Sequence, residues 1–197
     1  MAVQSLHTIP GAEFHDLVKE LAPYEPSGAK ALNQLVIGTP LLASYEDVER
    51  VATLMLKQVP KDRTRQDAVI FMGHGSGHHP ADMLYMATAE IFRRNDPLAF
   101  LGTVEGHPTF DDVVAQCQAA KIKKAYLMPF MAVAGDHALN DMAGSEPDSW
   151  KSVLESKKIE CIPVLKGTAD YEEIVQIWLD HLQQAINSSG HDGKHKK

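Results

Sequence analysis

The sequence lacks the features that mark several classes of protein. It has only two cysteines, Cys117 and Cys161, which lie far apart and match no cysteine-rich metal motif. No apolar run reaches the roughly 18 residues that a transmembrane helix needs, so we expect no membrane partner. Long basic stretches are also missing and the formal net charge is −7, which argues against nucleic acid as a partner. Charged side chains among the first 20 residues argue against a secretory signal there.

What remains is the composition of a globular protein. Hydrophobic residues make up 44% and charged residues 23% of the 197 residues, and this length fits one large domain or two small ones. The ten histidines are a high count for the length. They direct attention to metal binding and proton transfer, because imidazole is both a metal ligand and a base near neutral pH.

Strand-like and helix-like segments alternate along the chain. Strands are predicted at 2–9, 31–37, 68–72, 98–104, 124–131 and 160–165. Helices are predicted at 12–21, 44–59, 80–94, 110–121, 149–157 and 170–186. The alternation predicts an α/β protein in which helices flank parallel sheets. The polar segment 60–66 is the best candidate boundary, which gives domains at 1–62 and 63–186 and a disordered tail at 187–197.

Three residues follow three successive predicted strands. They are His74, Glu105 and His137, with separations of 31 and 32 residues, about one strand–helix unit each. Ligand sites of open parallel sheets lie beyond the carboxyl ends of the strands, so these loops should meet at one cleft. Two imidazoles and a carboxylate suit a divalent first-row metal ion and leave coordination positions open. The alternative is that each is an ordinary loop residue, because an alternating fold places some polar residue at every strand end.

The residues beside the two histidines are candidates for substrate binding. Gly75, Ser76, Gly135 and Asp136 lie in loops whose glycines allow close approach of the backbone and whose N–H groups can bind carboxylates. Asp141 has two interpretations from sequence, because it can orient His137 or cap a turn.

His15 lies apart from these loops, on the first predicted helix. We expect an exposed histidine with a structural role there. The alternative is an axial ligand of a haem at a subunit interface.

The motifs themselves resemble a known family. The segments FMGHGSGHH at 71–79, GTVEG at 102–106 and LMPFMAVAGDHALNDMAGSEPDSWK at 127–151 resemble the anaerobic sirohydrochlorin cobaltochelatases, the CbiK family. QSLHTIPG at 4–11 and GTPLLASYEDV at 38–48 extend the resemblance, which covers about 3–186. It implies two similar α/β domains with the active site in the cleft between them. It also implies ATP-independent insertion of Co²⁺ into sirohydrochlorin during cobalamin biosynthesis, with metal ligands at His74, Glu105 and His137.

The chain departs from the family pattern at its beginning. Family members have an N-terminal region of some tens of residues with the first strand of domain 1, whereas this sequence opens at one of the later strands. We therefore expect a fragment with an unpaired sheet edge, which favours a homo-oligomer. Cytoplasmic location is expected, with the periplasm as the alternative. Two other functions stay open: insertion of Fe²⁺ to make sirohaem, and binding of metal or tetrapyrrole without turnover.

Overall fold

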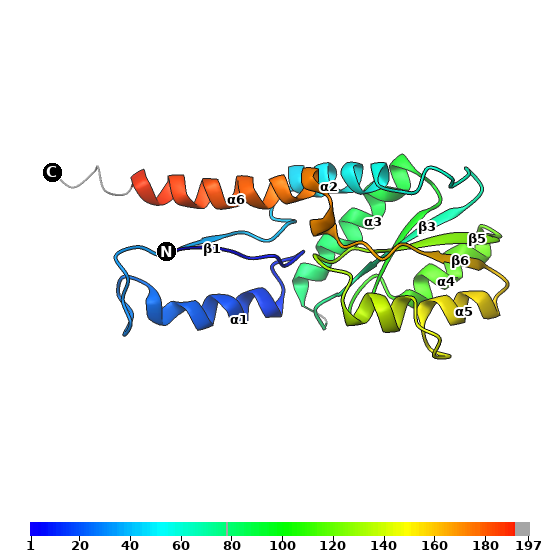
Figure 1. The fold of residues 1–197 in the computed structure, drawn as a ribbon, viewed down its shortest axis with the longest axis horizontal. Coiled ribbons are helices and arrows are strands. Elements are labelled where there is room, and N and C mark those ends of the chain that lie inside the picture. The colour runs from blue at the N-terminus through cyan, green and yellow to red at the C-terminus, as the bar shows by residue number, and fades with distance from the viewer. Residues whose placement is uncertain (78, 192–197) are drawn as a thin grey trace.

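The computed structural model describes residues 1–77 and 79–191, and it contains two separate parallel sheets (Figure 1). The larger has the strand order β4-β3-β5-β6. Its strands are β3 (Ala68–Gly73), β4 (Ala99–Thr103), β5 (Lys124–Pro129) and β6 (Glu160–Pro163), all paired in parallel. The smaller pairs β1 (Ala2–Gln4) with β2 (Val36–Gly38), also in parallel. The predicted α/β class with parallel sheets is confirmed.

Strand β3 lies between β4 and β5 in the larger sheet, and every one of its residues is buried, as the continuous apolar run AVIFM predicts. Alternate side chains feed two separate cores: Val69 and Phe71 enter one, and Ile70 enters the other. Phe71 stacks on Phe92 with ring centroids 4.3 Å apart. The helices on the two faces are α2 (Tyr45–Lys57) and α3 (Met83–Asn95) on one, and α4 (Phe110–Ala119) and α5 (Trp150–Ser156) on the other (Figure 1).

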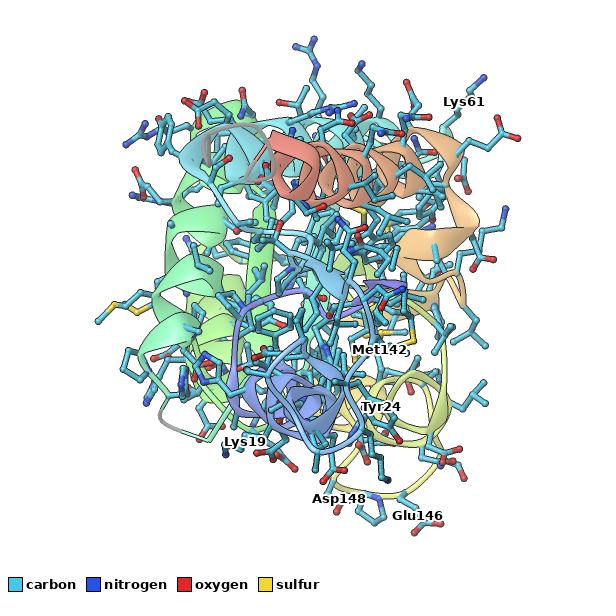
Figure 2. All side chains as sticks on the ribbon, turned by 90° about the vertical axis from the view of Figure 1, so that its left-hand side faces the viewer. Lys19, Tyr24, Lys61, Met142, Glu146 and Asp148 are labelled. Atoms are coloured by element: carbon cyan, nitrogen blue, oxygen red, sulfur yellow. The ribbon has the colours of Figure 1, made fainter. Side chains whose placement is uncertain are left out.

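The smaller sheet lies between α1 (Ala12–Leu21) and α6 (Glu172–His191) (Figure 1). In the end-on view of Figure 2 these helices lie on opposite sides of the strands, with Lys19 on the outer side of α1. Few residues are buried in this part of the molecule: α1 has none, and Gly38 is the only one in β1 and β2.

Several predicted boundaries are wrong. The strands predicted at 2–9 and 31–37 have three residues each, because β1 and β2 pair only with each other. The helix predicted from residue 80 starts with a 3₁₀ turn (Pro80–Asp82), and a π-helix (His137–Met142) was not foreseen. The last helix ends at His191, so 187–191 are helical rather than part of the predicted disordered tail. The rest of that tail, 192–197, lies outside the described residues.

Two helices connect the halves of the molecule. Helix α2 precedes the candidate boundary at 60–66, yet it packs against α3. Helix α6 follows the larger sheet, yet it packs against β1, β2 and α2. His181 of α6 lies 3.2 Å from the carboxylate of Asp47 at the start of α2, and both side chains are largely buried. No helix within 1–77 and 79–191 is long and apolar enough to cross a membrane.

Candidate metal and substrate site

The carboxyl ends of β3, β4 and β5 meet at one edge of the larger sheet, and the loops that follow them carry His74, Glu105 and His137. The first two loops are tied by their backbones, since the N–H of Glu105 donates to the carbonyl of His74 at 2.9 Å. Gly75 lies between them with a φ of +87°, and a Cβ there would lie 2.6 Å from the backbone nitrogen of Gly106. Only glycine fits this crossing of two strand-end loops.

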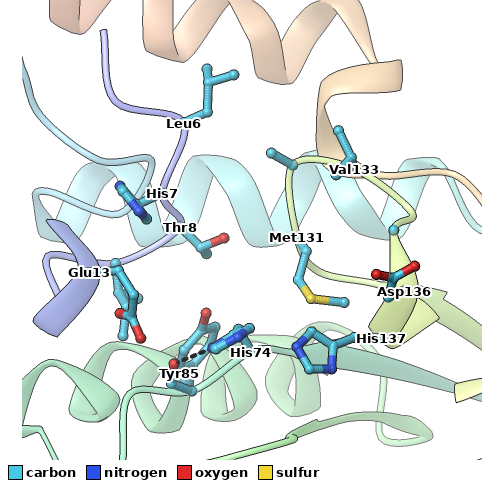
Figure 3. Close-up of a pocket in the computed structure, with 14 residues that line it drawn as sticks. Leu6, His7, Thr8, Glu13, His74, Tyr85, Met131, Val133, Asp136 and His137 are labelled. Carbon is cyan, nitrogen blue, oxygen red and sulfur yellow. Dashed lines mark hydrogen bonds between the residues drawn. The ribbon is translucent and has the colours of Figure 1, made fainter. Parts of the chain in front are cut away.

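The structure brings His74 and His137 together, with ring centroids 4.9 Å apart (Figure 3). The Nδ1 of His74 lies 2.9 Å from the carbonyl oxygen of Gly75, and the Nδ1 of His137 lies 2.5 Å from Oδ2 of Asp141. Both partners are acceptors, so each Nδ1 must carry the proton and each neutral ring keeps its lone pair on Nε2. Histidines that bind metals are commonly held this way, with the other ring nitrogen donating to a carbonyl or carboxylate.

The π-helix explains the contact between His137 and Asp141. His137 and Asp141 are four positions apart in the sequence, and the helical turn between them brings the carboxylate within hydrogen-bond distance of Nδ1. Of the two roles that the sequence left open for Asp141, the structure supports the orientation of His137.

Both histidines line a cavity of about 470 Å³ that has two walls. One wall comes from the loops after β3 and β5, and the other from the segment after β1 and the start of α1 (Figure 3). Its lining residues are Leu6, His7, Thr8, Ile9, Glu13, His74, Gly75, Tyr85, Met131, Ala132, Val133, Gly135, Asp136 and His137. This lining is mostly apolar, and the described residues that form it include no lysine or arginine.

Sequence reasoning missed His7 and Glu13, which are among the polar residues that line this cavity. Burial lowers the pKa of His7 from its ordinary value of 6.5, an effect that Glu13 opposes and His74 reinforces. The sequence placed His7 inside a strand that ran to residue 9. Because β1 ends at Gln4, His7 in fact follows a strand end, as His74 does. The rule that found His74 would have found His7 with the correct boundary.

The side chain of Glu105 occupies a different place. It lines a neighbouring cavity of about 490 Å³ together with Asp141, Asp148 and others, rather than the cavity of the two histidines. Among the described residues, no three histidine, cysteine, aspartate or glutamate side chains are grouped so that they could hold one metal ion. The structure therefore assembles the histidine pair, and leaves the expected third ligand beside it.

The four residues predicted to bind substrate do not all line the histidine cavity. Gly75, Gly135 and Asp136 line the histidine cavity, and Ser76 does not. Ser76 is 5% exposed, and its hydroxyl bonds the start of α1.

His15 is exposed on α1 and is not a lining residue of the histidine cavity. Its ring contacts that of His79, with centroids 5.1 Å apart.

Comparison with known proteins matches the chain to one family. The model of the family described as cobalt chelatase (CbiK) matches residues 1–187. The sirohydrochlorin cobaltochelatase CbiKC of Nitratidesulfovibrio vulgaris is 47% identical over 189 residues, which cover 95% of this chain and 66% of that protein. The sirohydrochlorin cobaltochelatase of Salmonella typhimurium is 36% identical over 191 residues, which cover 95% of this chain and 69% of that protein. The chain thus spans about two thirds of the length of these relatives.

A solved structure shares the fold. The protein titled SirB from Bacillus subtilis with Fe³⁺ superposes with a TM-score of 0.58 at 16% identity, covering 94% of this chain and 71% of that one. At this identity the likeness concerns the fold alone, and the family assignment rests on the sequence matches. On these matches, the chain belongs to the cobalt chelatase (CbiK) family.

Proposed function

We propose that this chain inserts Co²⁺ into sirohydrochlorin without ATP, as a metal chelatase of the lyase class. The observation that carries the proposal is the pair His74 and His137, whose Nε2 lone pairs are left free at the wall of a cavity of about 470 Å³. Family membership supports this choice of reaction, since both named relatives are sirohydrochlorin cobaltochelatases.

The two histidines are the proposed ligands of the substrate metal. Imidazole nitrogens bind first-row ions at about 2.0–2.1 Å, and rings with centroids 4.9 Å apart are close enough to share one ion. We propose Glu105 as the third ligand, reached by rotation of its side chain. Glu13 competes for this role because it lines the same cavity as the histidines. The carboxylate of either residue would supply an oxygen donor of the kind that Co²⁺ accepts.

Insertion exchanges one Co²⁺ for the two N–H protons of the ring. A cavity with two walls can hold the macrocycle bent, which exposes the lone pairs of its inward-facing nitrogens. Bending strains the ring, and the binding energy offsets this strain. Leu6 and Val133, 53% and 66% exposed, lie on opposite walls and offer apolar contact to the ring. His7, the third histidine among the described residues that line the cavity, is the proposed acceptor of pyrrole protons, because burial favours its neutral form.

The substrate carries eight carboxylates, whereas neither lysine nor arginine lines the cavity within 1–77 and 79–191. We propose that backbone N–H groups near Gly75 and Gly135 bind some of them and that the others face solvent. Asp136 carries the same charge as the substrate, so its part in binding is assigned to its backbone rather than to its carboxylate.

The test is Co²⁺ insertion into sirohydrochlorin, followed by the change in the absorption spectrum of the tetrapyrrole. Wild type should form product, and His74→Ala and His137→Ala should lose both insertion and Co²⁺ binding. Glu13→Gln and Glu105→Gln, assayed in parallel, identify the third ligand as the variant with the larger loss of Co²⁺ affinity. Normal insertion by His137→Ala would show that the metal site is assigned wrongly.

The same assay separates the alternatives. Faster insertion of Fe²⁺ than of Co²⁺ would favour synthesis of sirohaem, because imidazole and carboxylate ligands accept both ions. Binding of Co²⁺ or of tetrapyrrole without product would favour a binding protein. The cytoplasm remains the predicted compartment, and haem ligation by His15 remains the alternative to a structural role, testable by haem titration of His15→Ala.

A further inference from the structure

Helix α1 receives its N-terminal cap from a distant part of the chain. Its N-cap residue, Gly11, has no side chain to offer. The hydroxyl of Ser76 accepts a hydrogen bond from the backbone N–H of Ala12 at 2.9 Å. Ser76 is separated from Ala12 by 64 positions and is 5% exposed. A cap of this kind satisfies a helix N–H group that would otherwise lack a partner.

The same hydroxyl also donates to the carboxylate of Glu13, with Oγ 3.3 Å from Oε2. Glu13 lines the cavity, and Ser76 lies two residues after His74. One side chain therefore connects a carboxylate on the first wall of the cavity with the histidine loop on the second wall.

Gly11 makes this contact sterically feasible. A Cβ at that position would lie 2.5 Å from Oγ of Ser76, which is too close for any real contact. Helix α1 has no buried residue, so its position against the histidine loop depends on surface contacts such as this one and the ring contact of His15 with His79.

We propose that Ser76 is a positioning residue, which fixes the carboxylate of Glu13 in the cavity relative to His74. The proposal rests on the proposed function, in the form in which Glu13 rather than Glu105 supplies the carboxylate ligand. A free glutamate side chain has several rotamers, and a hydrogen bond to a buried hydroxyl selects one of them before metal and ring arrive. Ser76 thus acts through Glu13 and touches neither substrate.

The test is a double-mutant cycle on Ser76 and Glu13, read by Co²⁺ affinity and by kcat/KM for insertion. Loss of an outer hydrogen bond to a metal site typically costs about 10- to 100-fold, so we expect Ser76→Ala to lower Co²⁺ affinity or kcat/KM about 10-fold. The variant with both Ser76→Ala and Glu13→Gln should be no worse than Glu13→Gln alone, because the hydroxyl has then lost its target.

Ser44 provides a matched control. Its hydroxyl caps α2 by accepting from the N–H of Asp47 at 3.1 Å and donates to the Asp47 carboxylate at 2.8 Å. Ser44→Ala removes the same pair of bonds away from the cavity, so it should lower thermal stability and leave kcat/KM at the wild-type value. Gly11→Ala is a second probe, which displaces the Ser76 hydroxyl while keeping it, and should act in the same direction as Ser76→Ala.

The outcomes separate the two proposals. Wild-type insertion with unchanged kcat/KM and Co²⁺ affinity in Ser76→Ala overturns the positioning role, and so do losses that multiply in the double variant. A loss in Ser44→Ala as large as that in Ser76→Ala reduces the effect to general stability and also overturns it. A wild-type chain that neither binds nor inserts Co²⁺ overturns the proposed function itself.

Discussion

Replacing Asp141 with asparagine removes the charge that holds His137 while keeping the shape of the side chain. In the wild type the carboxylate can only accept, so it fixes the proton on Nδ1 and the lone pair on Nε2. An asparagine amide can turn its NH₂ group toward Nδ1, which moves the ring proton to Nε2 and blocks metal binding there. We expect Asp141→Asn to weaken Co²⁺ binding through this loss of tautomer control.

The structure also indicates how much Co²⁺ affinity Asp141→Asn should lose. Changes to the partners of metal-binding histidines typically cost about 10- to 100-fold in affinity, which is about 1.4 to 2.8 kcal/mol. The side chains of His137 and Asp141 are 37% and 47% exposed, so solvent screens the charge that the substitution removes. The expected loss therefore lies at the lower end, about 10-fold in the dissociation constant for Co²⁺.

The assay is a competition titration of Co²⁺ against a chelator of known affinity, with kcat/KM for insertion measured on the same samples. Asp148→Asn is the matched control, because Asp148 lines the same neighbouring cavity as Asp141, whereas the acceptor for His137 is Asp141. An affinity of Asp141→Asn within twofold of the wild type would refute the reasoning. Equal losses in the two variants would refute it as well, since the effect would then be one of net charge.

Three further outcomes are expected. Burial lowers the pKa of His7 in the folded chain, so the unfolded chain binds more protons there and the free energy of unfolding should fall as pH drops through 6.5. Urea unfolding at pH 7.5 and 5.5 should show a smaller fall in His7→Gln than in the wild type. Equal falls in the two proteins would contradict this. Gly75→Ala should abolish Co²⁺ binding in a titration, because Gly75 has a positive φ and an added Cβ would collide with the backbone of Gly106. Retained affinity would show that the loop crossing tolerates rearrangement. Phe71→Ala should lower the free energy of unfolding by about 3–5 kcal/mol, because it removes the ring stacked on Phe92. A loss below about 1 kcal/mol in urea denaturation would show that neighbouring side chains refill the space.

Much of the larger sheet was predictable because its strands are continuous apolar runs. Strand β3 is buried along its whole length, so its end at Gly73 is visible in the sequence. That end places His74 at the carboxyl edge, and the same logic places Glu105 and His137 in the neighbouring loops. The close approach of the two histidines followed from spacing and topology alone.

The remainder of the site depends on interactions that spacing does not encode. Parallel topology brings Glu105 to the correct edge, but the rotamer of its side chain decides which of two adjacent cavities it lines. Ser76 looked like a ligand-binding loop residue, and only the tertiary structure shows that its hydroxyl meets Ala12 and Glu13. The short strand β1 is stabilised by pairing and by α6 rather than by its own pattern, so its end could not be located from sequence.

The path of the last helix has a consequence for the order of assembly. Strands β1 and β2 contain Gly38 as their only buried residue, and α6 is the helix that packs against both of them. During synthesis the first strand leaves the ribosome more than 160 residues before this helix begins at Glu172. Strand β1 therefore lacks the cover of α6 until residues 172–191 have been made, whereas β3, β4 and β5 find their partners sooner. Strand β1 is thus made before the larger sheet and yet acquires its helix contacts after it.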